Sequence, residues 1–394
     1  MTQEKKARKS WRLRLCYIAD LKSSHTVRWV SYFAQKGHTV LVLSPTEIEL
    51  PGVLVRRIFR TPTLPKLVQL TNVLPVLWTI VSFRPHILHA HYARIYGWLA
   101  ALTFFRPLVV TVWGGDILED QGAFADVLGR TLTPFTLRRA DLVTAHSRFL
   151  RDRVMALGGR SAAVEMVGCP GVDRRLFKPG LDSKALRKEL RLGESRVVFC
   201  PRIIDTLYNT ETVVRAIPEV LREVPGVKFI FSQHMGSRPY IERMKRLAGE
   251  LGVEAATVFV GSIPHELMPL YFNLAEALVS IPDSDGMPQS LLEAMACGTV
   301  PVVSALPQYN GVVKNEENAL TVNQKDPHSL AGALIRLLKD DRARARLSNA
   351  AAGTTAEGMD YENEMAKMEK LYHKMAERRG KRGGGNDARC FLPE

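Results

Sequence analysis

Short runs of β-branched and aliphatic residues recur along both halves of this chain, and each is followed by a longer stretch with helical spacing. Such runs predict strands that are buried on both faces. They are LRLCYIAD (13–20), HTVLVLS (38–44), HILHAHY (86–92), LVVTVWGGD (108–116), DLVTAHS (141–147), VEMVGCPG (164–171), RVVFCPR (196–202), VKFIFSQ (227–233), ATVFVGS (256–262), EALVSIP (276–282) and TVPVVS (299–304). Their alternation with helices predicts an α/β protein with two doubly wound parallel sheets.

Turn residues cluster at CPGVDRRLFKPG (169–180) and predict the domain boundary there. We expect an N-terminal domain over 1–177, a C-terminal domain over 178–355, and a helix over 356–379 that packs back toward the N-terminal domain. The basic, glycine-rich tail at 380–394 is expected to be disordered. Ligands of doubly wound sheets bind outside the carboxyl ends of the strands, so we expect the chemistry in a cleft between the two facing domains.

Length and composition agree with this organisation. A chain of 394 residues with 46% hydrophobic and 24% charged residues is globular and too long for one core. No run approaches the roughly 20 apolar residues of a membrane-spanning helix, and the basic N-terminus has no apolar signal core, so we expect a cytoplasmic protein. The five cysteines have no paired spacing, which indicates reduced thiols rather than a zinc site or disulfides.

Charge is divided unevenly along the chain. Residues 1–180 carry 26 Lys and Arg against 12 Asp and Glu, whereas residues 181–394 carry 28 of each. The first half therefore favours an anionic partner, such as a phospholipid surface, a phosphorylated acceptor or nucleic acid; a basic surface that serves only solubility is the alternative. Because no segment resembles a nucleic-acid-binding module, nucleic acid is not expected as a partner.

The segment LPKLVQLTNVLPVLWTIVSF (64–83) is strongly apolar and adjoins several arginines. A helix here would lie in the interface of an anionic membrane, or its apolar face would cover the sheet. Both interpretations are open from the sequence.

The stretch PDSDGMPQSLLEAMACG (282–298) joins a buried strand to a short helix. A loop and helix N-terminus in this position bind phosphate, so residues Gly286, Met287, Pro288, Gln289 and Ser290 are predicted to offer amides to a diphosphate. Glu293, expected on the first turn of the helix, would accept hydrogen bonds from ribose hydroxyls, and Asp285 would reach the group beyond the phosphates. Alternatively, Ser290 and Glu293 form only a capping box.

The same stretch resembles the Glu-x7-Glu signature of the retaining glycosyltransferases of family 4, which have the GT-B fold of two Rossmann-like domains. The resemblance covers almost the whole chain. It includes SSHTVRWVSYFAQKGHTVLVLS (23–44), RPHILHAHYARIYGWLA (84–100), LVVTVWGGDIL (108–118), ADLVTAHS (140–147), PGVDRRLF (170–177), PRIIDTLYN (201–209) and GSIPHELMPLYFNLAEALVSIP (261–282).

The resemblance implies that the second domain binds a nucleotide-sugar donor and that the first shapes the acceptor site. It places Glu293 on the ribose, Asp285 on the donor sugar and Arg202 on the phosphates, where a guanidinium stabilises the leaving diphosphate. An interdomain salt bridge is the alternative role for Arg202. Ser262 and Ile263 fall where relatives touch the nucleotide base.

Three positions depart from the family pattern. Asp285 stands where the signature has its first glutamate, Leu207 where many relatives have a second phosphate-binding lysine, and Trp113 where relatives often have a histidine. The acceptor side is therefore assigned to Asp116 and His25, with His91 third. Asp116 and His25 could instead only tie loops together. His89 and His91 face the same side of their strand, so at least one of them could be packed in the core.

Metal and cofactor sites are not expected. Asp283 and Asp285 match the Asp-x-Asp motif, which binds a divalent metal in glycosyltransferases of the other major fold. The helix that follows and the two-domain pattern argue against that role here. No GxGxxG or GxxxxGK[ST] motif appears, so nicotinamide and P-loop chemistry are not expected either.

The sequence thus predicts a retaining glycosyltransferase that uses a nucleotide-diphosphate-sugar, with a UDP-sugar favoured. The acceptor would be a cell-envelope glycan or a lipid-linked molecule, reached from the inner membrane face. Two alternatives stay open: a catalytically degenerate protein that binds sugar nucleotide or glycan as a scaffold or regulator, and a sugar-nucleotide epimerase.

Overall fold

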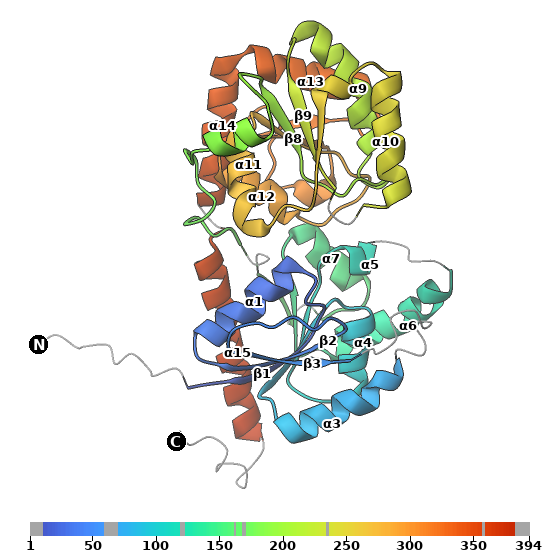
Figure 1. The fold of residues 1–394 in the computed structure, drawn as a ribbon. Coiled ribbons are helices and arrows are strands. Elements are labelled where there is room, and N and C mark those ends of the chain that lie inside the picture. Colours follow the sequence, from blue (N-terminus) through green and yellow to red (C-terminus); the bar gives the residue numbers. More distant parts are fainter. Residues whose placement is uncertain are drawn as a thin grey trace, which may run out of the picture. The chain divides into compact units, whose positions relative to one another are not determined.

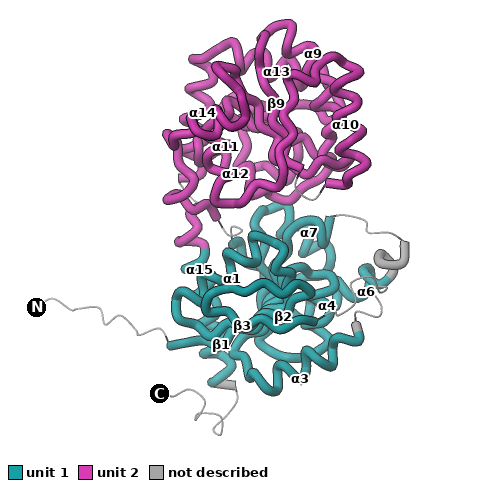
Figure 2. The backbone as a smooth tube through the Cα atoms, in the orientation of Figure 1, with its two compact units in different colours: residues 1–170, 365–394 teal, residues 171–364 magenta. Residues whose placement is uncertain are grey.

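The structure is a computed structural model that describes residues 11–58, 70–118, 123–160, 163–167, 171–233, 236–356 and 359–382. The chain forms two compact units (Figures 1 and 2), one of residues 1–170 and 365–394 and the other of residues 171–364. The first unit ends seven residues before the boundary that turn composition predicts at 177. Phe177 explains the difference, because its side chain is buried in the core of the second unit.

Unit 1 is built on a seven-stranded parallel sheet in the order β3-β2-β1-β4-β5-β6-β7. Its strands are β1 (Arg14–Ile18), β2 (Thr39–Ser44), β3 (Val53–Arg57), β4 (Ile87–His91), β5 (Leu108–Thr111), β6 (Leu142–Ala145) and β7 (Val164–Met166). Its helices are α1 (Ser24–Gln35), α3 (Val73–Phe83), α4 (Ile95–Leu102), α5 (Gly115–Leu118), α6 (Ala123–Arg139) and α7 (Arg148–Ala156). Alternate residues of one strand face opposite sides: Cys16 packs in the cluster that contains α3 and α4, whereas Tyr17 faces α1.

Unit 2 repeats this architecture with six parallel strands in the order β10-β9-β8-β11-β12-β13. The strands are β8 (Val197–Cys200), β9 (Lys228–Ser232), β10 (Thr257–Val260), β11 (Ala277–Ser280), β12 (Val300–Ser304) and β13 (Leu320–Val322). The helices are α8 (Lys184–Glu189), α9 (Thr210–Glu223), α10 (Arg238–Glu250), α11 (Met268–Leu274), α12 (Gln289–Ala296), α13 (Pro327–Lys339) and α14 (Asp341–Ala356). Two hydrophobic clusters cover its two faces, so the prediction of two doubly wound sheets is confirmed.

The last described helix, α15 (Tyr361–Arg382), packs on unit 1 from Met365 onward, as predicted for the C-terminal helix. Tyr372 is fully buried, and its hydroxyl lies 2.5 Å from His89 Nδ1 and accepts a hydrogen bond from Trp29 Nε1 at 3.3 Å. His89 Nε2 in turn lies 2.7 Å from the Thr111 hydroxyl. A buried polar network therefore connects α15 to the sheet, because each of these polar groups needs a partner once it leaves water. Residues 383–394, most of the predicted tail, lie outside the described residues.

Near the boundary of unit 2, its first and last segments run side by side. Val172 N–H donates to Met359 O at 2.7 Å, and Tyr361 N–H donates to Val172 O at 3.1 Å. Gly171 has φ +81°, and a Cβ there would lie 2.8 Å from backbone atoms of Tyr361. Only glycine fits this approach without strain.

The sequence did not predict two edge strands, β3 and β13. β3 is VLVRR, in which charged and apolar residues share a short, partly exposed strand, and β13 has three residues. β3 and β13 lack the continuous apolar run of a buried strand, so the pattern missed them, whereas it did predict the other two edge strands, β7 and β10.

Candidate donor site

The polar residues of unit 2 gather where the strand order of its sheet reverses. β8 and β11 are neighbours, and their crossover helices lie toward opposite edges of the sheet. Arg202 follows β8 by two residues, and the loop that follows β11 leads into α12. In an open parallel sheet this switch point leaves a crevice at the carboxyl ends of the strands, where ligands bind.

Arg202 and Asp285 form an ion pair at this point, with 2.8 Å between Nη2 and Oδ2. The guanidinium also lies over the Tyr208 ring, 4.5 Å from its centroid, and Tyr309 donates from its hydroxyl to Asp285 Oδ2 at 3.4 Å. Burial acts to lower the pKa of Arg202, but Asp285 and the two tyrosines outweigh it and raise that pKa above its ordinary value. The arginine is therefore a permanent cation held in a fixed orientation. Both partners of this ion pair belong to unit 2. The pair is therefore not the interdomain salt bridge that the sequence left open as an alternative.

The loop before α12 is oriented by contacts on both sides. Gly286 N–H donates to Asp285 Oδ1 at 2.8 Å, and the Ser290 hydroxyl lies 3.5 Å from Arg202 Nη1. Gln289 is buried, and its side chain donates to Gly171 O at 2.7 Å. Pro288 has no N–H, so the predicted set of amides at 286–290 is corrected to four. Pro288 is instead the N-cap of α12, where its missing donor costs nothing.

Glu293 is buried and bound to a histidine that the sequence did not indicate. Its Oε1 lies 2.8 Å from His265 Nε2. Because α12 begins at Gln289, Glu293 is its fifth residue and not on the first turn, and the capping box with Ser290 is excluded. His265 belongs to a 3-10 turn, His265–Leu267, whose preceding loop contains the exposed Ser262 and the half-buried Ile263. Its ring packs against Phe177, 5.1 Å between centroids.

The two acidic residues of the Asp-x-Asp sequence have different partners. Asp283 lies 2.7 Å from Lys325 Nζ and accepts from Asn209 Nδ2 at 2.8 Å. Asp285 pairs with Arg202 as described above. Each of the two carboxylates is therefore paired with a different cationic side chain, Lys325 for Asp283 and Arg202 for Asp285.

In unit 1, the predicted acceptor-side residues gather around Trp113. The His25 ring stacks on the indole at 5.1 Å between centroids, and the His91 ring lies 5.4 Å from it. His91 Nδ1 lies 3.1 Å from the Thr26 hydroxyl, while its Nε2 has no hydrogen-bond partner in the described parts of the chain. Burial, and next the charge of His25, lower the pKa of His91 to about 3, so it is neutral at physiological pH.

Asp116 has the contacts of a residue that ties loops together. Its carboxylate accepts from the backbone N–H groups of Ala93 at 2.7 Å and of Trp113 and Gly114 at 3.0 Å each. Burial raises its pKa, and these hydrogen bonds oppose the rise. Asp116 thus fixes the loop after β5 that carries Trp113.

Sequence reasoning missed Tyr208, Tyr309 and His265. His265 stands two residues after Ile263, and Tyr208 directly follows Leu207, so both lay inside quoted motifs but had no recognisable role. Tyr309 is 24 residues from Asp285, and only the fold brings them together. The Trp113 indole, noted only as a departure from the family, is the centre of the unit 1 cluster.

Two family models match the chain, and each falls on one unit. "Glycosyl transferase 4-like" matches residues 14–147, and "Glycosyl transferases group 1" matches residues 182–354, which include Arg202, Asp285 and Glu293. The chain belongs to the family 4 glycosyltransferases of GT-B fold.

Curated relatives of this chain carry related names. A GDP-mannose-dependent alpha-(1-6)-phosphatidylinositol monomannoside mannosyltransferase of Mycolicibacterium smegmatis is 33% identical over 53% of this chain and 56% of its own length. A D-inositol 3-phosphate glycosyltransferase of Acidothermus cellulolyticus is 28% identical over 84% of this chain and 79% of its own. The chain therefore spans only about half the length of the mannosyltransferase relative.

Solved structures share the fold. Anabaena HepE in complex with UDP and glucose superposes with a TM-score of 0.78, at 17% identity, over 91% of this chain and 99% of that one. Sucrose-phosphate synthase from Thermosynechococcus elongatus gives 0.77 at 19% identity, over 92% and 98%. Within the described residues, no helix combines the length and apolar character needed to cross a bilayer.

Proposed function

We propose that this protein transfers a sugar from a nucleotide-diphosphate-sugar to an acceptor hydroxyl with retention of configuration. The observation that carries the proposal is the Arg202–Asp285 ion pair at the switch point, next to the N-terminus of α12. A fixed guanidinium beside a loop and a helix N-terminus suits a diphosphate leaving group, because backbone amides point outward there. The Mycolicibacterium smegmatis relative is named a mannosyltransferase, which agrees with this class of reaction.

Each donor-site residue has a proposed role. Arg202 stabilises the negative charge that grows on the diphosphate, and the amides of Gly286, Met287, Gln289 and Ser290 hold its oxygens. Asp285 orients the donor sugar, and Glu293, set by His265, accepts from the ribose hydroxyls. Ser262 and Ile263 border the base. The backbone of this loop is proposed to make the contacts.

The reaction needs no protein nucleophile. The acceptor oxygen forms a bond to the anomeric carbon on the face from which the diphosphate leaves, the bond between that carbon and the phosphate oxygen breaks, and a leaving phosphate oxygen takes the acceptor proton. The protein contributes position and charge. The chemistry uses no cofactor, and we propose that it needs no metal ion.

The donor is proposed to be a UDP-sugar. The alternative donor is GDP-mannose, which appears in the name of the Mycolicibacterium smegmatis relative. An experiment must distinguish the two donors. The acceptor is proposed to be a cell-envelope glycan or a lipid-linked molecule, received in unit 1 beside His25, His91 and Trp113, with the protein on the cytoplasmic face of an anionic membrane.

Thermal shift measurements test the donor site. The melting temperatures of the purified protein and of its Glu293→Gln variant are measured with UDP-, GDP-, ADP- and TDP-sugars in the presence of EDTA. A ligand that binds only the folded state raises the melting temperature. A rise with one nucleotide that the variant loses supports the proposal, and no rise with any of them, with or without Mg²⁺, overturns it.

Two other functions are separated by the products. Leu207 and Trp113, in place of the family lysine and histidine, motivate the alternative of a protein that binds donor without turnover, whereas Arg202, Asp285 and Glu293 argue against it. For that alternative, donor binding without transfer or hydrolysis is expected. An epimerase would convert the donor sugar without any acceptor. Chromatography of the nucleotide and sugar products distinguishes all three.

A further inference from the structure

Helix α3 is apolar on two opposite faces. Its sequence, VLPVLWTIVSF, contains no charged residue. Val76, Thr79 and Ile80 are buried against the sheet of unit 1. Leu74, Trp78 and Val81 are 73%, 63% and 71% exposed. They are spaced by four and three residues, so they form one outward stripe, whereas the outer face of a helix on a globular protein is normally polar.

The edge strand β3 extends this stripe. The Arg56 guanidinium lies over the Trp78 ring, 4.7 Å from its centroid, and donates to the Thr79 hydroxyl at 3.0 Å. Leu54, two residues earlier and hence on the same face of β3, is 56% exposed. The apolar surface therefore continues from helix to sheet edge, with an arginine between them.

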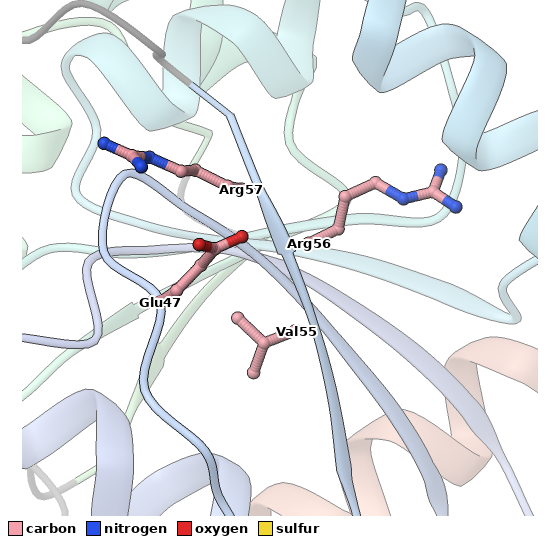
Figure 3. A pocket seen from close by; sticks show the side chains of 4 residues that line it. All are labelled: Glu47, Val55, Arg56 and Arg57. Atoms are coloured by element: carbon pink, nitrogen blue, oxygen red, sulfur yellow. The ribbon is translucent and has the colours of Figure 1, made fainter.

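The surroundings of the stripe are basic. Arg57, Glu47 and Val55 line a hollow of about 620 Å³ together with Arg56 (Figure 3), and the exposed Arg84 directly follows α3. Residues 50–115 hold seven Lys and Arg and no Asp or Glu. Unit 1 as a whole carries 31 Lys and Arg against 15 Asp and Glu, whereas unit 2 carries 23 against 25. The positive charge is therefore on the unit that exposes the stripe.

We propose that α3 and the edge of β3 form a docking surface for an anionic lipid bilayer. Leu74, Trp78 and Val81 enter the boundary between headgroups and acyl chains, where indole rings are favoured, and Arg56 and Arg84 contact lipid phosphates. A helix that lies in the plane of the interface needs one apolar face; α3 has this face in addition to the one that holds it to the sheet. An anionic bilayer would complement both the apolar stripe and the positive charge of unit 1.

Vesicle sedimentation with the full chain tests the proposal without any nucleotide-sugar. We expect binding to vesicles of phosphatidylcholine with phosphatidylglycerol, weak binding to phosphatidylcholine alone, and loss of binding as salt rises. The triple variant Leu74→Ser, Trp78→Ser, Val81→Ser should bind at least tenfold more weakly. Arg84→Gln should weaken binding roughly fivefold.

The matched control is Leu267→Ser, which removes an exposed leucine from unit 2 and should bind as the wild type does. All substitutions are at exposed positions, so the melting temperature should change little. Equal binding to neutral and anionic vesicles, no binding to either, or wild-type binding by the triple variant would each overturn the proposal. So would a concentration-dependent dimer that the triple variant abolishes, since a second copy would then be the occupant. None of these results bears on donor binding, which the thermal shift assay measures separately.

Discussion

The Arg202 guanidinium and the Asp285 carboxylate lie 2.8 Å apart, at the carboxyl ends of the two strands between which the unit 2 sheet reverses its order. Eighty-three positions along the sequence separate them. The pair places a permanent cation beside the N-terminus of α12 and holds the residue that replaces the family's first glutamate. Asp285 has a shorter side chain than glutamate, and in this structure it is already oriented by Arg202 and Tyr309.

Arg202→Lys should reduce kcat by about a hundredfold or more, because lysine keeps the charge but loses the planar fork that binds carboxylate and phosphate. The measurement is steady-state transfer with the donor found by thermal shift. Arg215→Lys is the control, since Arg215 forms an exposed pair with Glu211 on α9. An unchanged kcat in Arg202→Lys would show that Arg202 has no part in stabilising the leaving group.

His265→Ala should weaken donor binding about tenfold and change kcat less, because Glu293 then lacks the hydrogen bond that sets its carboxylate. Calorimetric titration with nucleotide and a KM measurement would check this. His328→Ala is matched, since His328 binds Glu219 in the same way at 2.7 Å on the surface. If KM stays at the wild-type value while only the melting temperature falls, His265 has a structural role alone.

Tyr372→Phe should lower the free energy of unfolding by about 1–3 kcal/mol, because it removes one hydroxyl from the buried network of Trp29 and His89. Chemical denaturation monitored by fluorescence and circular dichroism measures the change. Tyr271→Phe is the control, since that ring is buried by stacking on Phe199. Equal effects of the two substitutions would mean that the network does not anchor α15.

Unit 1 should lose stability in acid. Burial lowers the pKa of His146 to about 4 and that of His91 to about 3, both below the ordinary value of 6.5. The unfolded chain therefore binds more protons below pH 6.5, and stability falls from there toward pH 4 by about 1.4 kcal/mol per pH unit for each histidine. Above pH 6.5 the contribution is constant.

Melting curves between pH 4 and pH 8 check this prediction, with α15 and its network expected to unfold with unit 1. His91→Gln removes one titrating group, so its stability should depend less steeply on pH than that of the wild type. His328→Gln, at an exposed position of unit 2, should leave the slope unchanged. A wild-type slope in His91→Gln would contradict the assignment.

The periodic pattern was sufficient for the central strands. EALVSIP and RVVFCPR are continuous apolar runs because β11 and β8 are covered on both faces, and burial of that kind is visible in the sequence. β3 was missed because charged residues interrupt its apolar run, and β13 was missed because it has only three residues. The turn residues near position 170 indicated the region of the domain boundary. The burial of Phe177 in the core of unit 2 shows that this residue belongs to unit 2 and not to unit 1.

Sequence by itself determined the α/β class, the two sheets, the family, and the loop and helix that carry Asp285 and Glu293. All of these depend on contacts between near neighbours or on motifs that lie in one stretch of chain. The tertiary structure decided that Glu293 binds His265, that Tyr309 reaches Asp285, that Trp113 packs against His25 and His91, and that α3 exposes a second apolar face. Those relationships join residues on different elements, so they depend on strand order and packing, which a local pattern does not contain.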